Sequence, residues 1–291
     1  MSPTRKTLRL ALPTGPLVAD VWTPPAPTTA TPIVLVHGWG NSGSYWANTA
    51  EALAHHTRVI VPDLPGTGRS QPIQRPHNMY DQVAALETLL DELNLPKVHL
   101  VGHSMGSAMS LLLSERAPQR IDRLVITSMC FFLTEGQRRT YRTVMNMLYL
   151  TMRLRWPWMI NVPGLAEAMG RRYFYHLPSD PMVLKQGFKD YLTLDFHTAV
   201  ACAKNACDHT IPTAGRLLQS PALLIACRED NVMPVENVDF TVNTIPNCDV
   251  RWIDDCGHMP MVEKPAEYVS ILREFLQLPH PTPLSERTLS A

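Results

Sequence analysis

Continuous apolar runs of strand length recur along the chain, and most are followed by stretches whose apolar residues are spaced as on one face of a helix. A strand covered by helices on both faces has such a run, and a helix packed on a sheet has apolar residues three or four positions apart. The chain therefore predicts an α/β fold with a mostly parallel sheet. The expected strands are 32–36, 58–61, 97–101, 123–127, 221–227 and 249–253, and the expected helices are 45–55, 79–93, 107–117, 235–244 and 265–276.

Two segments depart from this alternation. Residues 7–12 and 17–22 flank a Pro/Gly turn and predict a hairpin at a sheet edge. From 129 to 215 no β-branched run of strand length occurs, which predicts a helical insertion. Its clearest helix is expected at 138–156, ended by Pro157, with one apolar stripe. The members of that stripe are Tyr141, Val144, Met145, Leu148, Met152 and Trp156.

This organisation predicts a core of residues 1–128 and 216–278, a helical cap of residues 129–215, and a polar tail of residues 279–291 that we expect to be disordered. Ser44 is the expected N-cap of the helix at 45–55. With 291 residues, of which 45% are hydrophobic, the chain can bury a large core.

The charge balance and the cysteines indicate which partners and which cellular compartment to expect. Lys+Arg and Asp+Glu are balanced at 26 each, which removes the broad basic field that non-specific nucleic-acid binding requires. The six cysteines form no C-x-x-C pair or regular framework, as is typical of a reducing compartment. The apolar stretch after Lys6 is broken by Arg9 and Pro13, so neither a signal peptide nor a membrane span is expected. We expect a soluble, cytoplasmic protein.

The candidate nucleophile lies in the pentapeptide Gly102-His103-Ser104-Met105-Gly106, which fits G-x-S-x-G. An expected strand precedes it and an expected helix follows it, so the pattern predicts a sharp strand-to-helix turn with Ser104 at its tip. Glycines flank the serine because strand and helix approach each other too closely there for side chains. The alternative is that Ser104 only caps the helix, but capping alone does not require both glycines.

A serine hydroxyl is a poor nucleophile at neutral pH and needs a base that a carboxylate orients. Two later strands end in these residue types. The first is followed by Arg228-Glu229-Asp230, and the second by Asp254-Asp255-Cys256-Gly257-His258. The order is then Ser104, Asp230, His258, with Glu229 as the alternative acid.

In these features the chain resembles the α/β-hydrolase fold family over residues 7–277. Four motifs carry the resemblance: 37–40 (His-Gly-Trp-Gly), 63–70, 102–106, and the loops of Asp230 and His258. The resemblance implies that Ser104 is the nucleophile, His258 the general base, and Asp230 the group that orients it. It also implies an oxyanion hole made of the Met105 and Trp39 backbone N–H groups. Departures from the family pattern are Cys227, where relatives often have glycine, and Ser107, where many have a second glycine.

No metal or organic cofactor is implied. The cluster His197, Cys202, Cys207 and His209 has spacings that match no familiar zinc site, and its cysteines are better explained as core residues. The expected pocket-lining residues are His37, Gly38, His103, Met145, Met152 and Met259.

The Met- and aromatic-rich insertion favours a serine esterase or lipase-like enzyme that acts on a neutral, apolar small-molecule ester. The alternatives are a hydrolase or acyltransferase acting on a carrier-bound ester or thioester, a C–C bond hydrolase, and a catalytically silent relative that binds a ligand or partner. Basic residues outnumber acidic ones in the insertion, so transient contact with an acidic carrier or membrane surface is a further expectation. The sequence does not indicate an oligomeric state.

Overall fold

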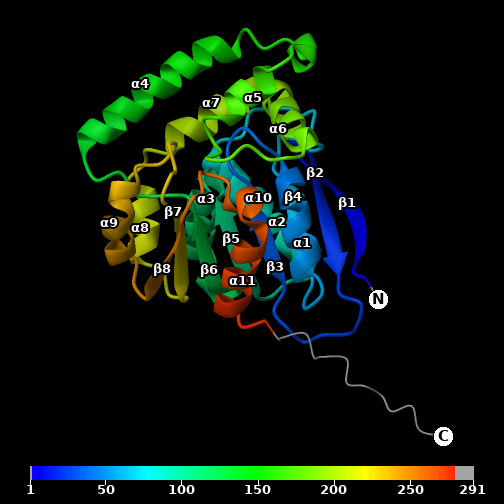
Figure 1. The fold of residues 1–291 in the computed structure, drawn as a ribbon. Coiled ribbons are helices and arrows are strands. Elements are labelled where there is room, and N and C mark those ends of the chain that lie inside the picture. Colours follow the sequence, from blue (N-terminus) through cyan, green and yellow to red (C-terminus); the bar gives the residue numbers. More distant parts are fainter. Residues whose placement is uncertain (1, 279–291) are drawn as a thin grey trace, which may run out of the picture.

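The computed structural model describes residues 2–278 and shows an eight-stranded sheet with helices on both faces (Figure 1). The strand order is β1-β2-β4-β3-β5-β6-β7-β8. Among these strands, β1 with β2 and β2 with β4 pair antiparallel, and the other neighbours pair parallel. The predicted α/β fold with a mostly parallel sheet is confirmed. The strands are β1 Thr4–Leu12, β2 Gly15–Thr23, β3 Ile33–Val36, β4 Val59–Asp63, β5 Val98–His103, β6 Ile121–Thr127, β7 Ala222–Cys227 and β8 Cys248–Ile253.

Each face of the sheet has its own apolar core, because alternate residues of a strand point to opposite sides. In β3, Val34 and Val36 pack with helices α2 and α3, whereas Ile33 and Leu35 pack with α1 and α11. Helices α8 and α9 join the first of these cores. The core helices are α1 Ala47–Leu53, α2 Met79–Glu92, α3 Met105–Arg116, α8 Thr210–Arg216, α9 Val238–Thr244, α10 Pro260–Glu263 and α11 Pro265–Phe275.

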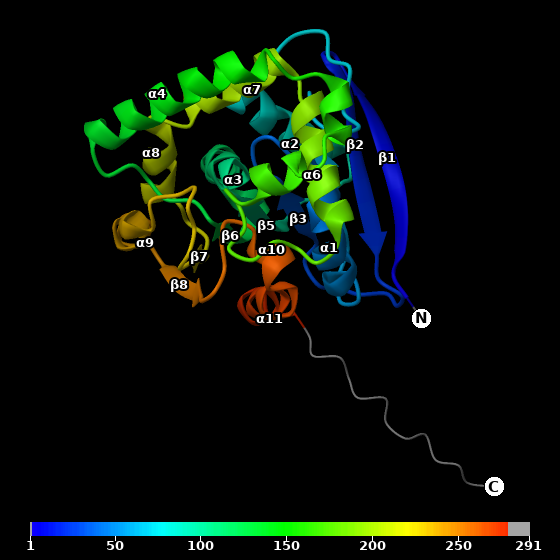
Figure 2. The ribbon, with the colours of Figure 1, turned by 45° about the horizontal axis from the view of Figure 1, so that its top comes forward.

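Four helices between β6 and α8 lie together over one end of the strands (Figure 2). We call them the cap helices. They are α4 Glu135–Met152, α5 Leu165–Gly170, α6 Pro181–Thr193 and α7 Phe196–Asn205, with a 3-10 turn, η3 Pro157–Asn161, after α4. Figure 1 shows α4 as the outermost of them.

The bounds of α4 correct the expected helix at 138–156. The helix begins earlier, because the Thr134 side chain accepts a hydrogen bond from the Gln137 N–H and so caps it. It ends at Met152, before the extended Trp156 that precedes Pro157. Trp156, expected on the buried stripe, is 48% exposed.

The expected helix at 45–55 is also different. A 3-10 turn, η1 Gly43–Trp46, precedes α1, and the side chain of Ser42 caps it rather than Ser44. Both serine hydroxyls donate to Asp190 Oδ2 on α6, over 2.5 Å from Ser42 and 3.0 Å from Ser44. Ser44, the predicted N-cap residue, therefore joins the cap helix α6 to the core instead of capping a helix.

None of the helices within residues 2–278 combines the length and apolar character needed to cross a bilayer. The expectation of a disordered tail at 279–291 lies outside the described residues.

The close backbone contact at Gly106 predicts that adding one methyl group there lowers the stability of the protein considerably. A Cβ on Gly106 would lie 2.4 Å from the Val36 carbonyl oxygen and 2.6 Å from that of His37. We expect Gly106→Ala to lower the free energy of unfolding by about 3 kcal/mol, because backbone atoms cannot move aside as a side chain can.

The matched control is Gly136→Ala in α4, where the new Cβ meets only Thr134 Oγ1, at 3.5 Å. This variant should be neutral or slightly stabilised. Urea unfolding measures the free energy of unfolding of both variants. Equal values for Gly106→Ala and Gly136→Ala would contradict the close backbone contact at Gly106.

Candidate active site

Ser104 lies between the end of β5 and the start of α3 with φ 52° and ψ −121°. Left-handed φ values are rare for residues with a side chain, and such strain concentrates at functional sites. The Ser104 hydroxyl makes no capping hydrogen bond to α3, a helix the structure describes in full. The geometry is that of the strand-to-helix turn that the sequence predicts, with the serine at its tip.

Asp230 and His258 are brought together from the loops after β7 and β8. His258 Nδ1–H donates to Asp230 Oδ2 over 2.8 Å, and both residues are buried. Asp230 Oδ1 accepts from the N–H groups of Val232 and Met233 at 2.7 and 3.0 Å. A donor at Nδ1 leaves the other ring nitrogen of neutral His258 free to accept a proton.

Burial favours the protonated form of Asp230, but His258 and the two N–H donors outweigh burial and lower the pKa of its carboxyl. The carboxylate is therefore charged at neutral pH. The alternative acid, Glu229, points elsewhere, because its Oε2 accepts from the Cys256 N–H at 2.9 Å.

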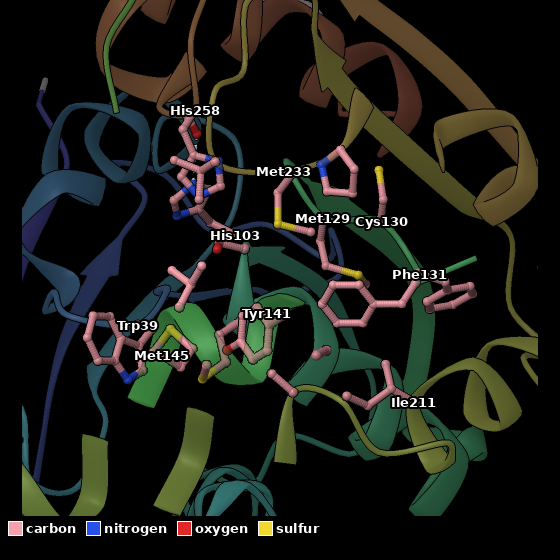
Figure 3. Close-up of a pocket in the computed structure, with 18 of the residues that line it drawn as sticks. Trp39, His103, Met129, Cys130, Phe131, Tyr141, Met145, Ile211, Met233 and His258 are labelled. Carbon is pink, nitrogen blue, oxygen red and sulfur yellow. Dashed lines mark hydrogen bonds between the residues drawn. The ribbon is translucent and has the colours of Figure 1, made fainter. Parts of the chain in front are cut away.

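Ser104 and His258 line one cavity of about 250 Å³, together with Trp39 and Met105 (Figure 3). Of the expected pocket residues, His103, Met145 and Met259 line this cavity. His37 and Gly38 lie beside it, and the His37 ring is occupied by the Leu64 N–H at 3.0 Å and the Thr67 hydroxyl at 3.1 Å. Met152 instead packs in a small cluster with Leu194 and Ala199.

Three further residues of the predicted apolar stripe of α4 line the cavity, namely Tyr141, Val144 and Leu148. Most of the remaining wall consists of residues that the sequence did not single out. They come from the segment after β6, from α8 and from the Asp230 loop, and they include Met129, Cys130, Phe131, Phe132, Ile211 and Met233. The cavity is predominantly apolar.

A hydrogen-bonded chain links the first glycine-rich turn to the His258 loop. His103 Nε2 lies 2.9 Å from the His258 carbonyl oxygen, which can only accept, so this nitrogen carries the proton. His103 Nδ1 then accepts from the Tyr45 hydroxyl at 2.9 Å, and Tyr45 Oη accepts from the Gly38 N–H at 2.8 Å. Burial and the adjacent His258 lower the pKa of His103 to about 3, so its ring is neutral. Each hydrogen bond from Gly38 through Tyr45 and His103 to His258 therefore has a fixed donor and a fixed acceptor.

The His258 loop is also tied to the segment between α5 and α6. The His258 N–H donates to the Tyr173 carbonyl at 2.7 Å. Glu263 accepts on both oxygens: Oε1 from the Gly257 N–H at 2.9 Å, and Oε2 from the N–H groups of Tyr175 and His176 at 2.9 and 3.0 Å. A single carboxylate therefore joins the cap to the residue next to His258.

Within residues 2–278 no three His, Cys, Asp or Glu side chains come close enough together to hold a metal ion. In the cluster considered from the sequence, Cys202 and Cys207 are buried, and the Cys202 thiol donates to the His77 carbonyl.

Comparison with known proteins places this geometry in a family. The profile of the alpha/beta hydrolase fold family matches residues 31–265. The chain belongs to the α/β-hydrolase fold family. The chain is similar to 2-hydroxy-6-oxo-2,4-heptadienoate hydrolase of Pseudomonas putida, with 29% identity over 84% of this chain and 88% of the relative. It is also similar to 2-hydroxymuconate semialdehyde hydrolase of Pseudomonas sp. CF600, with 27% identity over 84% of this chain and 86% of the relative.

Solved structures share the fold of this chain. An esterase from Thermogutta terrifontis aligns with a TM-score of 0.73 and 24% identity over 94% of this chain and 98% of that chain. The enol-lactonase of Burkholderia xenovorans LB400 aligns with a TM-score of 0.74 and 20% identity over 93% of this chain and 100% of that chain.

The Glu263 contacts predict that its amide analogue damages the site. In Glu263→Gln, one end of the side chain is an NH₂ group, which cannot accept from the N–H groups that the carboxylate joins. We expect kcat to fall about tenfold with little change in KM, because displacement of His258, the expected general base, affects the chemical step more than binding.

Glu274→Gln is the matched control, since this glutamate of α11 is exposed and pairs only with Arg251 at the surface in the contacts described. Steady-state kinetics on a p-nitrophenyl ester checks both variants. A Glu263→Gln enzyme with the kcat of the control would contradict a role for Glu263 in placing His258.

Proposed function

We propose that this protein is a serine hydrolase that cleaves a neutral, apolar carboxylic ester through an acyl-enzyme. The observation that supports the proposal most is the pairing of His258 Nδ1 with buried Asp230, while His258 and Ser104 face one cavity. A base held in this tautomer can take the serine proton, which a lone buried histidine would not be oriented to do.

The reaction proceeds in two steps. His258 accepts the Ser104 proton as Oγ attacks the ester carbonyl, and the oxyanion is bound by the Trp39 and Met105 backbone N–H groups. Each N–H contributes about 3 kcal/mol of transition-state stabilisation. His258 then gives the proton to the departing alcohol, and water activated by His258 releases the acid and restores Ser104.

A neutral acyl group fits the cavity better than a charged one. Two arginines contribute to the wall, but Arg138 is already satisfied: its Nη1 donates to the Cys207 carbonyl at 2.7 Å and its Nε lies 3.1 Å from Glu135. Arg172 is exposed. The wall is predominantly apolar, and burying a charge against it without a partner would be costly.

The mechanism predicts that Ser104→Ala loses all measurable turnover of p-nitrophenyl acyl esters, because no other hydroxyl is positioned at the strand-to-helix turn. Thermal unfolding and circular dichroism should match the wild type. A fluorophosphonate probe should label the wild type at Ser104 and leave the variant unlabelled. Unchanged turnover in the variant would refute the mechanism, and an unlabelled, inactive wild type would favour a silent ligand-binding relative.

A C–C bond hydrolase is the second candidate, because the two curated relatives named above are hydrolases of a dienoate and of a muconate semialdehyde. Such substrates carry a carboxylate, which needs a cation at the cavity. Arg172 is the arginine of the wall that has an exposed side chain, so it would serve this purpose.

The two candidate functions predict different effects of Arg172→Gln on kcat/KM. For an esterase of neutral substrates, kcat/KM on p-nitrophenyl butyrate should remain within about twofold of wild type, since no charge is recognised. For a C–C hydrolase, kcat/KM on a 2-hydroxy-6-oxo-dienoate should fall at least tenfold. Arg171→Gln, also exposed but absent from the cavity wall, is the control. Turnover of the dienoate far above that of every ester would overturn the ester assignment.

A further inference from the structure

The outer side of α4 and the turn after it expose large apolar side chains. Met147 and Leu150 are each 66% exposed, Leu154 is 56% exposed, and Trp156 and Trp158 are 48% and 60% exposed. Met147 and Leu150 are three residues apart in α4 and therefore share one side of the helix, and Leu154 lies in the turn that follows it. The two indole rings stack with centroids 6.2 Å apart. We call these five residues the outer apolar face.

The opposite side of α4 is already used inside the protein. Tyr141, Met145 and Leu148 line the cavity that contains Ser104. A helix that is apolar on both sides is normally buried on both sides. Large exposed apolar surface marks a contact with something outside the chain.

The charged residues of the segment that carries this face are all positive. From 136 to 166 the chain contains five arginines and no aspartate or glutamate. The arginines are Arg138, Arg139, Arg142, Arg153 and Arg155, of which Arg139, Arg142 and Arg153 are exposed. Arg153 lies one helical turn after Leu150, and Arg139 lies about two turns before Met147. The Arg153 guanidinium lies over the Phe196 ring, 5.7 Å from its centroid, and among the ion pairs of the described residues none involves Arg139, Arg142 or Arg153. Positive charge therefore flanks the outer apolar face.

We propose that the outer apolar face docks on the surface of an anionic lipid bilayer. Aliphatic side chains such as Met147 and Leu150 can enter the boundary between headgroups and acyl chains, and tryptophan indoles are enriched at this depth. Exposed arginines beside them are attracted to anionic headgroups. The combination of these three features on one segment favours a lipid surface over other partners.

A second copy of the chain would satisfy these features less well. In a two-fold dimer through this face, the arginines of one protomer would lie near the same arginines of the other, and no acidic residue of the segment would offset them. An acidic protein would neutralise the arginines but would also have to cover five large apolar side chains.

Docking in this way places a wall of the cavity at the lipid surface. Val144 lines the cavity and is also 55% exposed, so α4 separates the bilayer from the site by the width of one helix. Together with the proposed esterase function, on which this step rests, it implies a substrate that partitions into lipid.

Sedimentation with vesicles tests the docking without reference to catalysis. The full chain should sediment with vesicles of phosphatidylcholine and phosphatidylglycerol, much less with phosphatidylcholine alone, and less as salt is raised. The double variant Met147→Glu/Leu150→Glu should lose at least tenfold in vesicle partitioning, and so should Arg139→Glu/Arg142→Glu. Ser104→Ala should bind like the wild type, so failure of the catalytic proposal would leave this result unaffected.

The matched control is Leu217→Glu, a residue at the end of α8 that is 57% exposed and lies outside the outer apolar face. It should bind vesicles like the wild type. The charge variants should keep the circular dichroism spectrum and thermal unfolding midpoint of the wild type, which shows that they fold. The proposal is overturned by a wild-type chain that does not bind anionic vesicles, or by an equal loss in Leu217→Glu. It is also overturned by a wild-type dimer in light scattering that Met147→Glu/Leu150→Glu dissociates, since a second copy would then cover the face.

Discussion

The contact between Gly106 and the end of β3 is the constraint on which the rest of the site depends. A Cβ on Gly106 would lie 2.4 Å from the Val36 carbonyl, so α3 and β3 meet backbone to backbone. One consequence is that the turn carrying Trp39 and the turn carrying Met105 belong to one rigid unit. If these two N–H groups receive an oxyanion, their spacing is set by main-chain packing, and no mobile side chain is needed to complete it.

Asp230 and His258, the proposed acid and base, are positioned by hydrogen bonds rather than by close backbone packing. Asp230 and His258 lie in loops after neighbouring parallel strands. The Asp230 side chain accepts from two backbone N–H groups, and it also accepts from the His258 ring. The His258 loop is further joined to the cap through Tyr173 and Glu263, and to the first turn through His103 and Tyr45. The placement of His258 therefore depends on both the core and the cap, whereas Ser104 depends on the core alone.

The parts that could be predicted from sequence are those governed by local rules. Strand runs, the glycines around Ser104, and residues at strand ends follow from period and steric need, and the predicted α/β sheet is confirmed. The cavity wall could not be predicted, because Phe131, Ile211 and Met233 come from three distant segments that meet only in the folded chain. The helical period does not predict the exposure of Trp156, because α4 ends at Met152 and Trp156 lies beyond it. Glu263 had no signal at all, since its role depends on N–H groups almost ninety residues earlier in the chain.

The contact of Asp190 with Ser42 and Ser44 has a consequence for exchanging parts of the cap. Besides the two serines, this buried carboxylate accepts from Gln186 at 2.8 Å, so α6 is bound to the turn that follows Trp39. Segments 171–195 and 37–46 then behave as a matched pair, and a chimera that replaces one without the other would leave a buried carboxylate without its donors. The stretch 135–162 has no such bond to that turn among the contacts described. It is joined instead to the later part of the cap, through Arg138 to the Cys207 carbonyl and through Arg155 to the Tyr191 and Leu194 carbonyls, so a chimera that exchanges it has to keep these carbonyl partners.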